Sequence, residues 1–177
     1  RVKEEGMACY RAAGIATVLS FSLTNRPDVP VSAAANGVGG QSVAVFQQYA
    51  KAPSVRVRDQ YGNGVPGVGV QFTLPAIGAS GAFADASASP LTVATDATGV
   101  VSSPAVVANG TVGVWYADAV AGAISPAVRF RMNNLIAPTA KIVAVDGSTP
   151  QSTTRGTLFG SPLIAVVEDD QGRAIGG

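Results

Sequence analysis

The sequence predicts an all-β protein that is built from repeated antiparallel β-sandwich units. Three observations support this prediction. Short segments alternate apolar and polar residues with a period of two, as half-buried strands do. Turn-forming residues punctuate the chain about every 8–12 residues, which is typical of sandwiches with many short strands. Two parts of the chain also match each other at a constant offset of 110 residues.

Composition narrows the range of functions before any motif is considered. The 177 residues carry a net charge of +1, so there is no basic surplus to attract nucleic acid. No histidine is present, which excludes His-based triads and His metal sites. The single cysteine, Cys9, cannot form a disulfide within the chain. No Gly-x-Ser-x-Gly or Ser-x-x-Lys pattern is present, so we expect no enzyme, no catalytic residue and no cofactor.

The N-terminal region admits two interpretations. Residues 7–36 resemble a signal peptide in outline, with Arg11, an apolar run over 12–23 and small residues at 32–35. Residues 20–24, however, alternate polar and apolar side chains, and this favours a strand. No apolar run approaches the roughly 20 residues that cross a bilayer, so we expect no membrane insertion in this segment.

In the middle of the chain, the residue pattern predicts a series of strands and turns. A first pair is predicted at 42–48 and 53–59, because valines alternate with arginines in the second segment. A turn follows over 59–64, since Asp accepts backbone N–H bonds and Gly and Asn tolerate positive φ. Residues 68–74 alternate most clearly. The predicted core side chains are Val55, Val57, Val70, Phe72, Val114, Tyr116 and Phe130.

Shorter strands complete this unit. The dipeptide Asn109-Gly110 is a strong hairpin signal, and residues 96–99 read as another turn. About seven short strands with such turns between them are typical of an antiparallel β-sandwich. The remaining strands are expected near 81–84, 91–95, 99–102, 112–116 and 127–132.

Two adjacent aromatic residues must point to opposite faces of their strand. Val112 and Val114 share a face with Tyr116 by the period of two, so we expect Tyr116 in the core. This leaves Trp115 as a possible exposed contact for a partner.

The internal repeat divides the chain. From Gln41 and Gln151 onward the two copies align without a gap, and Asp59 falls on Asp169. A second match, at an offset of 109, joins residues 20–25 to 129–134. We therefore expect residues 1–25 to be the C-terminal strands of one unit, 26–135 a complete unit, and 136–177 the N-terminal strands of a third.

The run over 54–73, SVRVRDQYGNGVPGVGVQFT, carries a family resemblance. Its Asp-x-x-Gly-Asn turn, Val-Pro-Gly-Val turn and Val-x-Phe strand resemble the bacterial immunoglobulin-like domain, group 1, of the invasin and intimin family. The segments 78–83, 95–100 and 108–111 fit the same family in order. The resemblance implies immunoglobulin-like sandwiches repeated in tandem in long cell-surface or secreted proteins. Related modules also decorate phage tail proteins.

The candidate site residues are mainly structural. A calcium site at Glu168-Asp169-Asp170, or at Asp59, is one interpretation, because clustered carboxylates suit hard cations. An Asp-capped turn is favoured instead, so we expect no metal. The residues assigned to turns are Asp59, Gly62, Asn63, Gly67, Asp96, Gly99, Asn109 and Gly110.

These expectations favour a structural spacer or stalk segment of a long, multi-repeat bacterial surface protein or filament, located at the cell surface or outside the cell. The alternatives are a receptor- or glycan-binding adhesin module and a phage tail decoration domain. The expected partners are neighbouring repeats or copies of the same protein, or an unknown surface receptor. The partial units at both ends should need cover, since Phe159, Ile164 and Val166 belong to a core that 136–177 cannot complete.

Overall fold

The computed structural model describes residues 6–10, 19–23, 26–37, 39–138 and 140–176. Every regular element in these ranges is a strand, and no helix in them is long and apolar enough to cross a membrane. The strands are β1 (Gly6–Tyr10), β2 (Leu19–Leu23), β3 (Ser32–Ala35), β4 (Gln41–Ala44), β5 (Ser54–Arg58), β6 (Gly69–Thr73), β7 (Gly81–Phe83), β8 (Leu91–Ala94), β9 (Val100–Ser102), β10 (Val106–Ala108), β11 (Gly113–Ala121), β12 (Val128–Leu135), β13 (Lys141–Ala144) and β14 (Ala165–Glu168).

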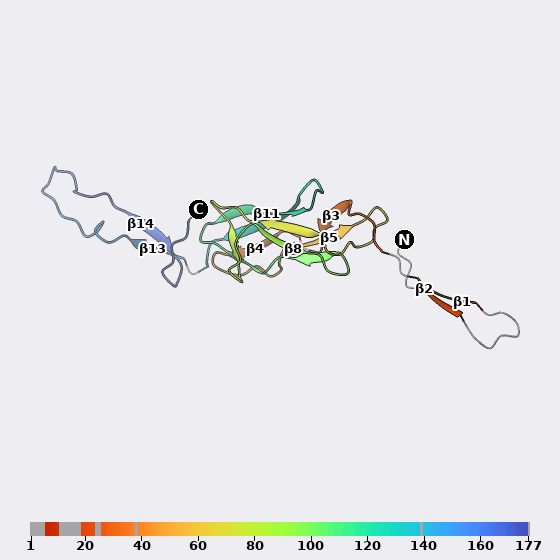
Figure 1. Cartoon of the computed structure of the whole chain (residues 1–177). Helices are drawn as coiled ribbons and strands as arrows, with labels where there is room; N and C mark the ends of the chain where they lie inside the picture. The colour runs from red at the N-terminus through yellow and green to blue at the C-terminus, as the bar shows by residue number, and fades with distance from the viewer. Residues whose placement is uncertain (1–5, 11–18, 24–25, 38, 139, 177) are drawn as a thin grey trace.

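The central strands form a β-sandwich (Figure 1). One layer is a five-stranded sheet with the order β4-β12-β11-β6-β8. The other layer consists of the three-stranded sheet β3-β5-β9 and the pair β10-β7. Strands β4 and β12 run parallel, and the other pairs of named strands among the described residues are antiparallel. The prediction of an all-β sandwich is confirmed.

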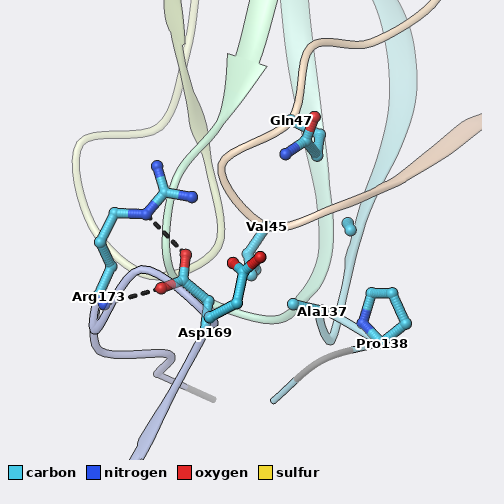
Figure 2. A pocket seen from close by; sticks show the side chains of 8 residues that line it. Val45, Gln47, Ala137, Pro138, Asp169 and Arg173 are labelled. Atoms are coloured by element: carbon cyan, nitrogen blue, oxygen red, sulfur yellow. Dashed lines mark hydrogen bonds and ion pairs between the residues drawn. The ribbon is translucent and has the colours of Figure 1, made fainter.

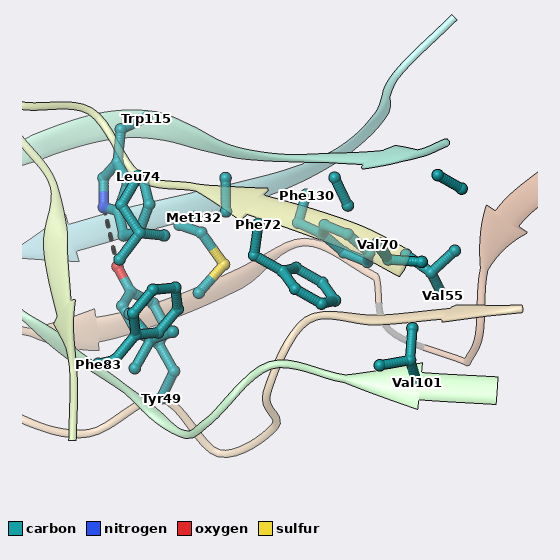
Figure 3. Close-up of a cluster of buried hydrophobic side chains, with 14 of the residues drawn as sticks. Tyr49, Val55, Val70, Phe72, Leu74, Phe83, Val101, Trp115, Phe130 and Met132 are labelled. Carbon is teal, nitrogen blue, oxygen red and sulfur yellow. Dashed lines mark hydrogen bonds between the residues drawn. The ribbon is translucent and has the colours of Figure 1, made fainter. Parts of the chain in front are cut away.

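The core lies between the two layers and follows the period-two pattern (Figure 3). Strand β6 alternates exposed and buried side chains, and Val70 and Phe72 are its buried pair. From the opposite layer, Val55 and Val57 of β5 are fully buried. Phe130 of β12 is also buried, as predicted. Five of the seven predicted core side chains therefore lie in the core. Each of the five stands on the covered face of its strand.

The expectation for Trp115 and Tyr116 is wrong. Trp115 is 4% exposed, whereas Tyr116 is 42% and Val114 is 48% exposed. The reason lies further along β11, where Ala117 and its alternate neighbours form the inward row. That row shares a face with Trp115. Tyr116 instead shares the outer face with the charged Asp118, whose burial without a partner would be costly.

Two predicted strand pairings are also wrong. Residues 42–48 and 53–59 do not pair with each other, because β4 lies beside β12 while β5 lies between β3 and β9. Strand β3 was missed, since Ser and Ala give a weak strand signal. Asn109-Gly110 does not close a hairpin either: it joins β10 in one layer to β11 in the other. A local turn motif predicts that the chain bends there, but it does not predict which strand pairs with the strand that follows.

Two antiparallel strand pairs flank the sandwich at opposite ends (Figure 1). Strands β1 and β2 pair from Gly6↔Leu23 to Tyr10↔Leu19, and β13 pairs with β14. The division of the chain at 135/136 stays a prediction. Val166 of β14 is half-buried, whereas large apolar side chains between residues 142 and 164 are exposed. They are Ile142, Leu158, Phe159, Leu163 and Ile164.

Candidate functional site

The turn after β5 is held by one carboxylate. Asp59 accepts hydrogen bonds at Oδ1 from the backbone N–H groups of Tyr61 (2.9 Å) and Asn63 (2.8 Å). Its Oδ2 accepts from the Asn63 side chain (2.8 Å) and from the Asp28 backbone (3.1 Å). Gly62 has a φ of +86°, a conformation that glycine adopts without strain. The carboxylate therefore fixes the turn and ties it to the entry of the unit.

A similar turn recurs after β14, 110 residues later. Asp169 Oδ1 accepts from the backbone N–H groups of Gln171 (3.0 Å) and Arg173 (2.8 Å). Its Oδ2 accepts from Arg173 Nε (2.6 Å), at the place where Asn63 donates to Asp59. Gly172 also has a positive φ, of +77°. The two turns thus share their backbone geometry and differ in one donor side chain.

Another pair of hydrogen bonds recurs at the start of the aligned segments. The Gln41 side chain accepts from the Lys51 N–H (2.9 Å) and donates to the Lys51 carbonyl (2.8 Å). The Gln151 side chain makes the same two bonds with Ser161, at 3.1 and 3.0 Å. The repeat that the sequence indicates therefore has a counterpart in hydrogen bonding.

Hydrogen-bond donors around the two turn carboxylates lower the pKa values of Asp59 and Asp169. Burial raises the pKa of Asp59, but the hydrogen bonds from Asn63, Asp28 and Tyr61 outweigh it and lower the value to about 2. The pKa of Asp169 is also lowered, by its bonds to Arg173 and Gln171 against the effect of burial. In the described part of the chain, no group of three or more His, Cys, Asp or Glu side chains could hold a metal ion.

Acid should weaken the fold through these carboxylates. Because the folded pKa of Asp59 lies below the unfolded value of about 3.9, its ionised form stabilises the fold above that value. We expect the free energy of unfolding to fall as the pH drops from about 4 to about 2. Asp59→Asn should be less stable at pH 7 and should lose less stability across that window. Urea titrations at a series of pH values measure both effects; an equal acid loss in the variant and the unmodified chain would contradict this assignment.

A second Asp-capped turn lies beside the first. Asp96 Oδ1 accepts from the Thr98 N–H and hydroxyl and from the Val100 N–H. Gly99, with a φ of +75°, packs so closely on the first turn that a Cβ there would lie 2.6 Å from the Gly64 Cα. The neighbouring Gly67, at +73°, donates its N–H to the Thr95 carbonyl. The predicted turn residues of both segments thus meet at one end of the three-stranded sheet.

At the other end of the sandwich, a buried amide organises the 109–111 loop. Asn134 is fully buried, and its Oδ1 accepts from the Tyr49 hydroxyl (2.5 Å) and from Trp115 Nε1 (2.8 Å). Figure 3 shows the Trp115 nitrogen directed at the Tyr49 oxygen, 3.2 Å away. Asn134 Nδ2 lies 2.9 Å from each of three acceptors, the Ser80 carbonyl, Asn109 Oδ1 and the Thr111 carbonyl.

This loop contacts the segment that follows β14. The Gly176 N–H donates to the Gly110 carbonyl (2.7 Å), and the Val112 N–H donates to the Gly176 carbonyl (2.6 Å). Beside these bonds, the guanidinium of Arg173 lies over the ring of Phe46. We call this region the junction: residues 44–47 and 109–112 of the sandwich, and residues 169–176 after β14.

A cavity of about 330 Å³ opens at the junction (Figure 2). The Asp169–Arg173 pair lies on one side of it, and Val45 and Pro138 contribute from other segments. The Asp169 carboxylate is occupied by its own turn and by Arg173, so it does not present a free acid to the cavity. Among the residues that line this cavity there is no constellation for acid–base or nucleophilic chemistry.

The sequence does not predict the side chains that make the main contacts here. Phe46 and Tyr49 lie in the segment after β4, Asn134 in β12 and Arg173 after β14, and none of them belongs to a motif. One signal was available: the offset of 110 places Arg173 on Asn63 and Gly156 on Phe46, and such differences between copies can mark contacts between units.

No protein-family model matches the sequence, and no curated protein matches it. Similar solved structures do exist. The adhesin FdeC of Escherichia coli is 14% identical over 89% of this chain and 48% of its own, with a TM-score of 0.46. Domains 4–9 of the surface layer protein SbsC are 19% identical over 97% of this chain and 25% of that one, with a TM-score of 0.41. Domains 1–6 of SbsC are 19% identical over 90% and 19%, with a TM-score of 0.42.

The chain spans about half of the FdeC structure and a smaller share of the two SbsC structures. At TM-scores below 0.5 these likenesses carry no argument about function. The resemblance to the invasin and intimin type of domain stays a prediction from the quoted motifs. What the chain's own residues establish is an all-β sandwich joined by specific contacts to a repeated Asp-capped turn.

Proposed function

We propose that this chain is a spacer segment of a long bacterial surface protein or filament, in which β-sandwich units follow one another and hold other parts at a distance. The observation that carries the proposal is the recurrence at Asp169 of the two backbone hydrogen bonds that the Asp59 carboxylate accepts, in a unit that contacts the first one directly. The division at residues 25/26 and 135/136 and a location outside the cell are parts of this proposal.

A spacer needs units that are connected by more than a loose linker. Here the backbone of Gly176 bonds to the 109–112 segment on both its N–H and its carbonyl. The direct connection between the units, residues 136–140, is short. Short connections and backbone pairing both limit bending, which is what a stalk requires.

A receptor- or glycan-binding role gains no such observation. The exposed aromatic side chain on the outer face of the five-stranded sheet is Tyr116. Arg129 lies over its ring at 5.0 Å and is paired with Asp118 at 2.9 Å. One face of the ring is therefore already occupied, and a stacking ligand would have to displace the arginine.

Small-angle X-ray scattering on the full chain tests the extended form. A compact protein of this length has a radius of gyration of about 16 Å. We expect a clearly larger value, with a distance distribution typical of an elongated, folded particle. Duplication of residues 26–135 after Leu135 should lengthen the particle by a further unit. A radius near the compact value, or a duplication that leaves the maximum dimension unchanged, would contradict the spacer role.

A further inference from the structure

Phe46 holds a backbone conformation that is rare for its residue type. Its φ is +63°, in the left-handed region where a bulky side chain is strained. The turn around it closes with a bond from the Gln47 N–H to the Ala44 carbonyl (3.1 Å). It is here that the chain leaves the partner strand β12 and crosses to pair with β10.

The third unit builds the same turn with glycine. Gly156 lies 110 residues after Phe46, has a φ of +84°, and is followed by a Thr157 N–H bond to the Thr154 carbonyl (3.1 Å). The turn itself therefore requires the left-handed backbone, and glycine supplies it without strain. The presence of phenylalanine at this strained position therefore needs another reason, which is the contact that its ring makes.

The ring of Phe46 lies between the two units. On one side is Gly110, where an added Cβ would lie 2.6 Å from the ring Cζ and 2.9 Å from the Ala174 carbonyl oxygen. On the other side the guanidinium carbon of Arg173 lies 4.1 Å from the ring centroid, in cation–π geometry. Asp169 holds that guanidinium in place through Nε, at 2.6 Å.

We propose that Phe46, Gly110, Arg173 and Gly176 form a lock that holds the central and third units as one rigid body. The ring fills the contact, and glycine at 110 leaves room for it. Gly176 adds its two backbone bonds to the same loop. The inference rests on the proposed spacer role. It adds that the rigidity of a junction depends on particular residues, which not every repeat has.

The lock is specific to this junction. In the central unit the counterpart of Arg173 is Asn63, which has no guanidinium, and the counterpart of Gly176 is Pro66, which has no N–H to donate. A junction made by the 59–66 turn therefore lacks two parts of the lock. Similarly, a unit with Gly156 in place of Phe46 offers no ring to a unit docked on it. The residues at these positions thus decide which of the lock's contacts a junction can make.

Matched substitutions follow from the repeat itself. Phe46→Gly introduces the residue that the third unit uses in the same turn, so it removes the ring and relieves the backbone. Arg173→Asn introduces the residue of the central unit, and Asn63 shows that this side chain still donates to the turn carboxylate. Arg155→Asn, an exposed change in the same unit, is the control.

Residual dipolar couplings of backbone amides measure the relative order of the units in the full chain. In the unmodified chain and in Arg155→Asn, couplings from β5, β6 and β11 and from β13 and β14 should fit a single alignment tensor. In Phe46→Gly and Arg173→Asn, the alignment magnitude of β13 and β14 should fall at least twofold. Cross-strand contacts between Lys141 and Glu168 should persist and show that the hairpin is intact.

Several results would overturn the lock. One is that the couplings of the unmodified chain already need two alignment tensors. Another is that the couplings of both variants still fit a single tensor. Loss of the Lys141–Glu168 contacts in both variants would also count against it, because the lock acts between folded units. The spacer role would survive each of these results if scattering still shows an elongated chain that lengthens with the duplicated unit.

Discussion

Replacing Asn134 with alanine should lower the free energy of unfolding by about 3–5 kcal/mol, as expected for a buried polar centre with several partners. Its Oδ1 serves the Tyr49 hydroxyl and the Trp115 indole, which are buried in the core. Each donor that is left without an acceptor in the interior costs about 1–3 kcal/mol. The three acceptors that Nδ2 faces lose their shared donor as well.

The neighbouring residue provides the control. Asn133 lies on the other face of β12, and its side chain makes one long contact with Ser42, at 3.5 Å. Asn133→Ala should therefore change stability by less than about 0.5 kcal/mol, as surface changes usually do. Urea unfolding of both variants gives the comparison. Equal midpoints for Asn133→Ala and Asn134→Ala would show that the buried amide network contributes little.

The loss at Asn134 should also extend to the junction. The same amide fixes Asn109 Oδ1 and the Thr111 carbonyl, and these flank the Gly110 carbonyl that accepts from Gly176. Amide hydrogen exchange at Val112, whose N–H bonds to Gly176, should rise more than exchange in β6 once global unfolding is accounted for. The Asn134 side chain thereby couples the stability of the sandwich to the order of the junction.

Strand positions and core faces were predicted best where the pattern is long and one face is covered. Residues 68–74 alternate without interruption, and the structure buries Val70 and Phe72 as expected. Period two fixes which side chains share a face, and burial of either face fixes the register. The Asp-capped turns were also predictable in kind, because the residues that make them interact within a few positions of one another.

Partners that are distant in the sequence were not predictable from one chain. Strand β4 pairs with β12, about 90 residues away, and no local pattern identifies that partner. Asn134 looks like a surface residue in sequence, yet it is fully buried, because five groups from other parts of the chain satisfy its side chain. A single sequence gives the period of a strand but not the groups that meet it across the sheet.

The wrong assignment of the aromatic pair leads to the second large effect. Trp115→Ala should lower the free energy of unfolding by about 3–5 kcal/mol, the usual cost of removing a large buried aromatic side chain. The indole is 4% exposed and meets the Tyr49 ring edge-on, with centroids 6.0 Å apart. Its removal leaves a cavity beside Tyr49 that the surrounding strands cannot close without shifting.

Tyr116→Ala separates the two possible registers of β11. Tyr116 lies on the outer face, and its main partner is the guanidinium of Arg129, at 5.0 Å. Loss of an exposed cation–π contact costs about 0.5–1 kcal/mol, so this variant should stay close to the unmodified chain in thermal and urea unfolding. The original expectation requires the reverse order, with Tyr116→Ala the more damaging change. Because Trp115 is buried and bonded to Asn134 whereas Tyr116 is exposed, we expect Trp115→Ala to be the costlier of the two changes.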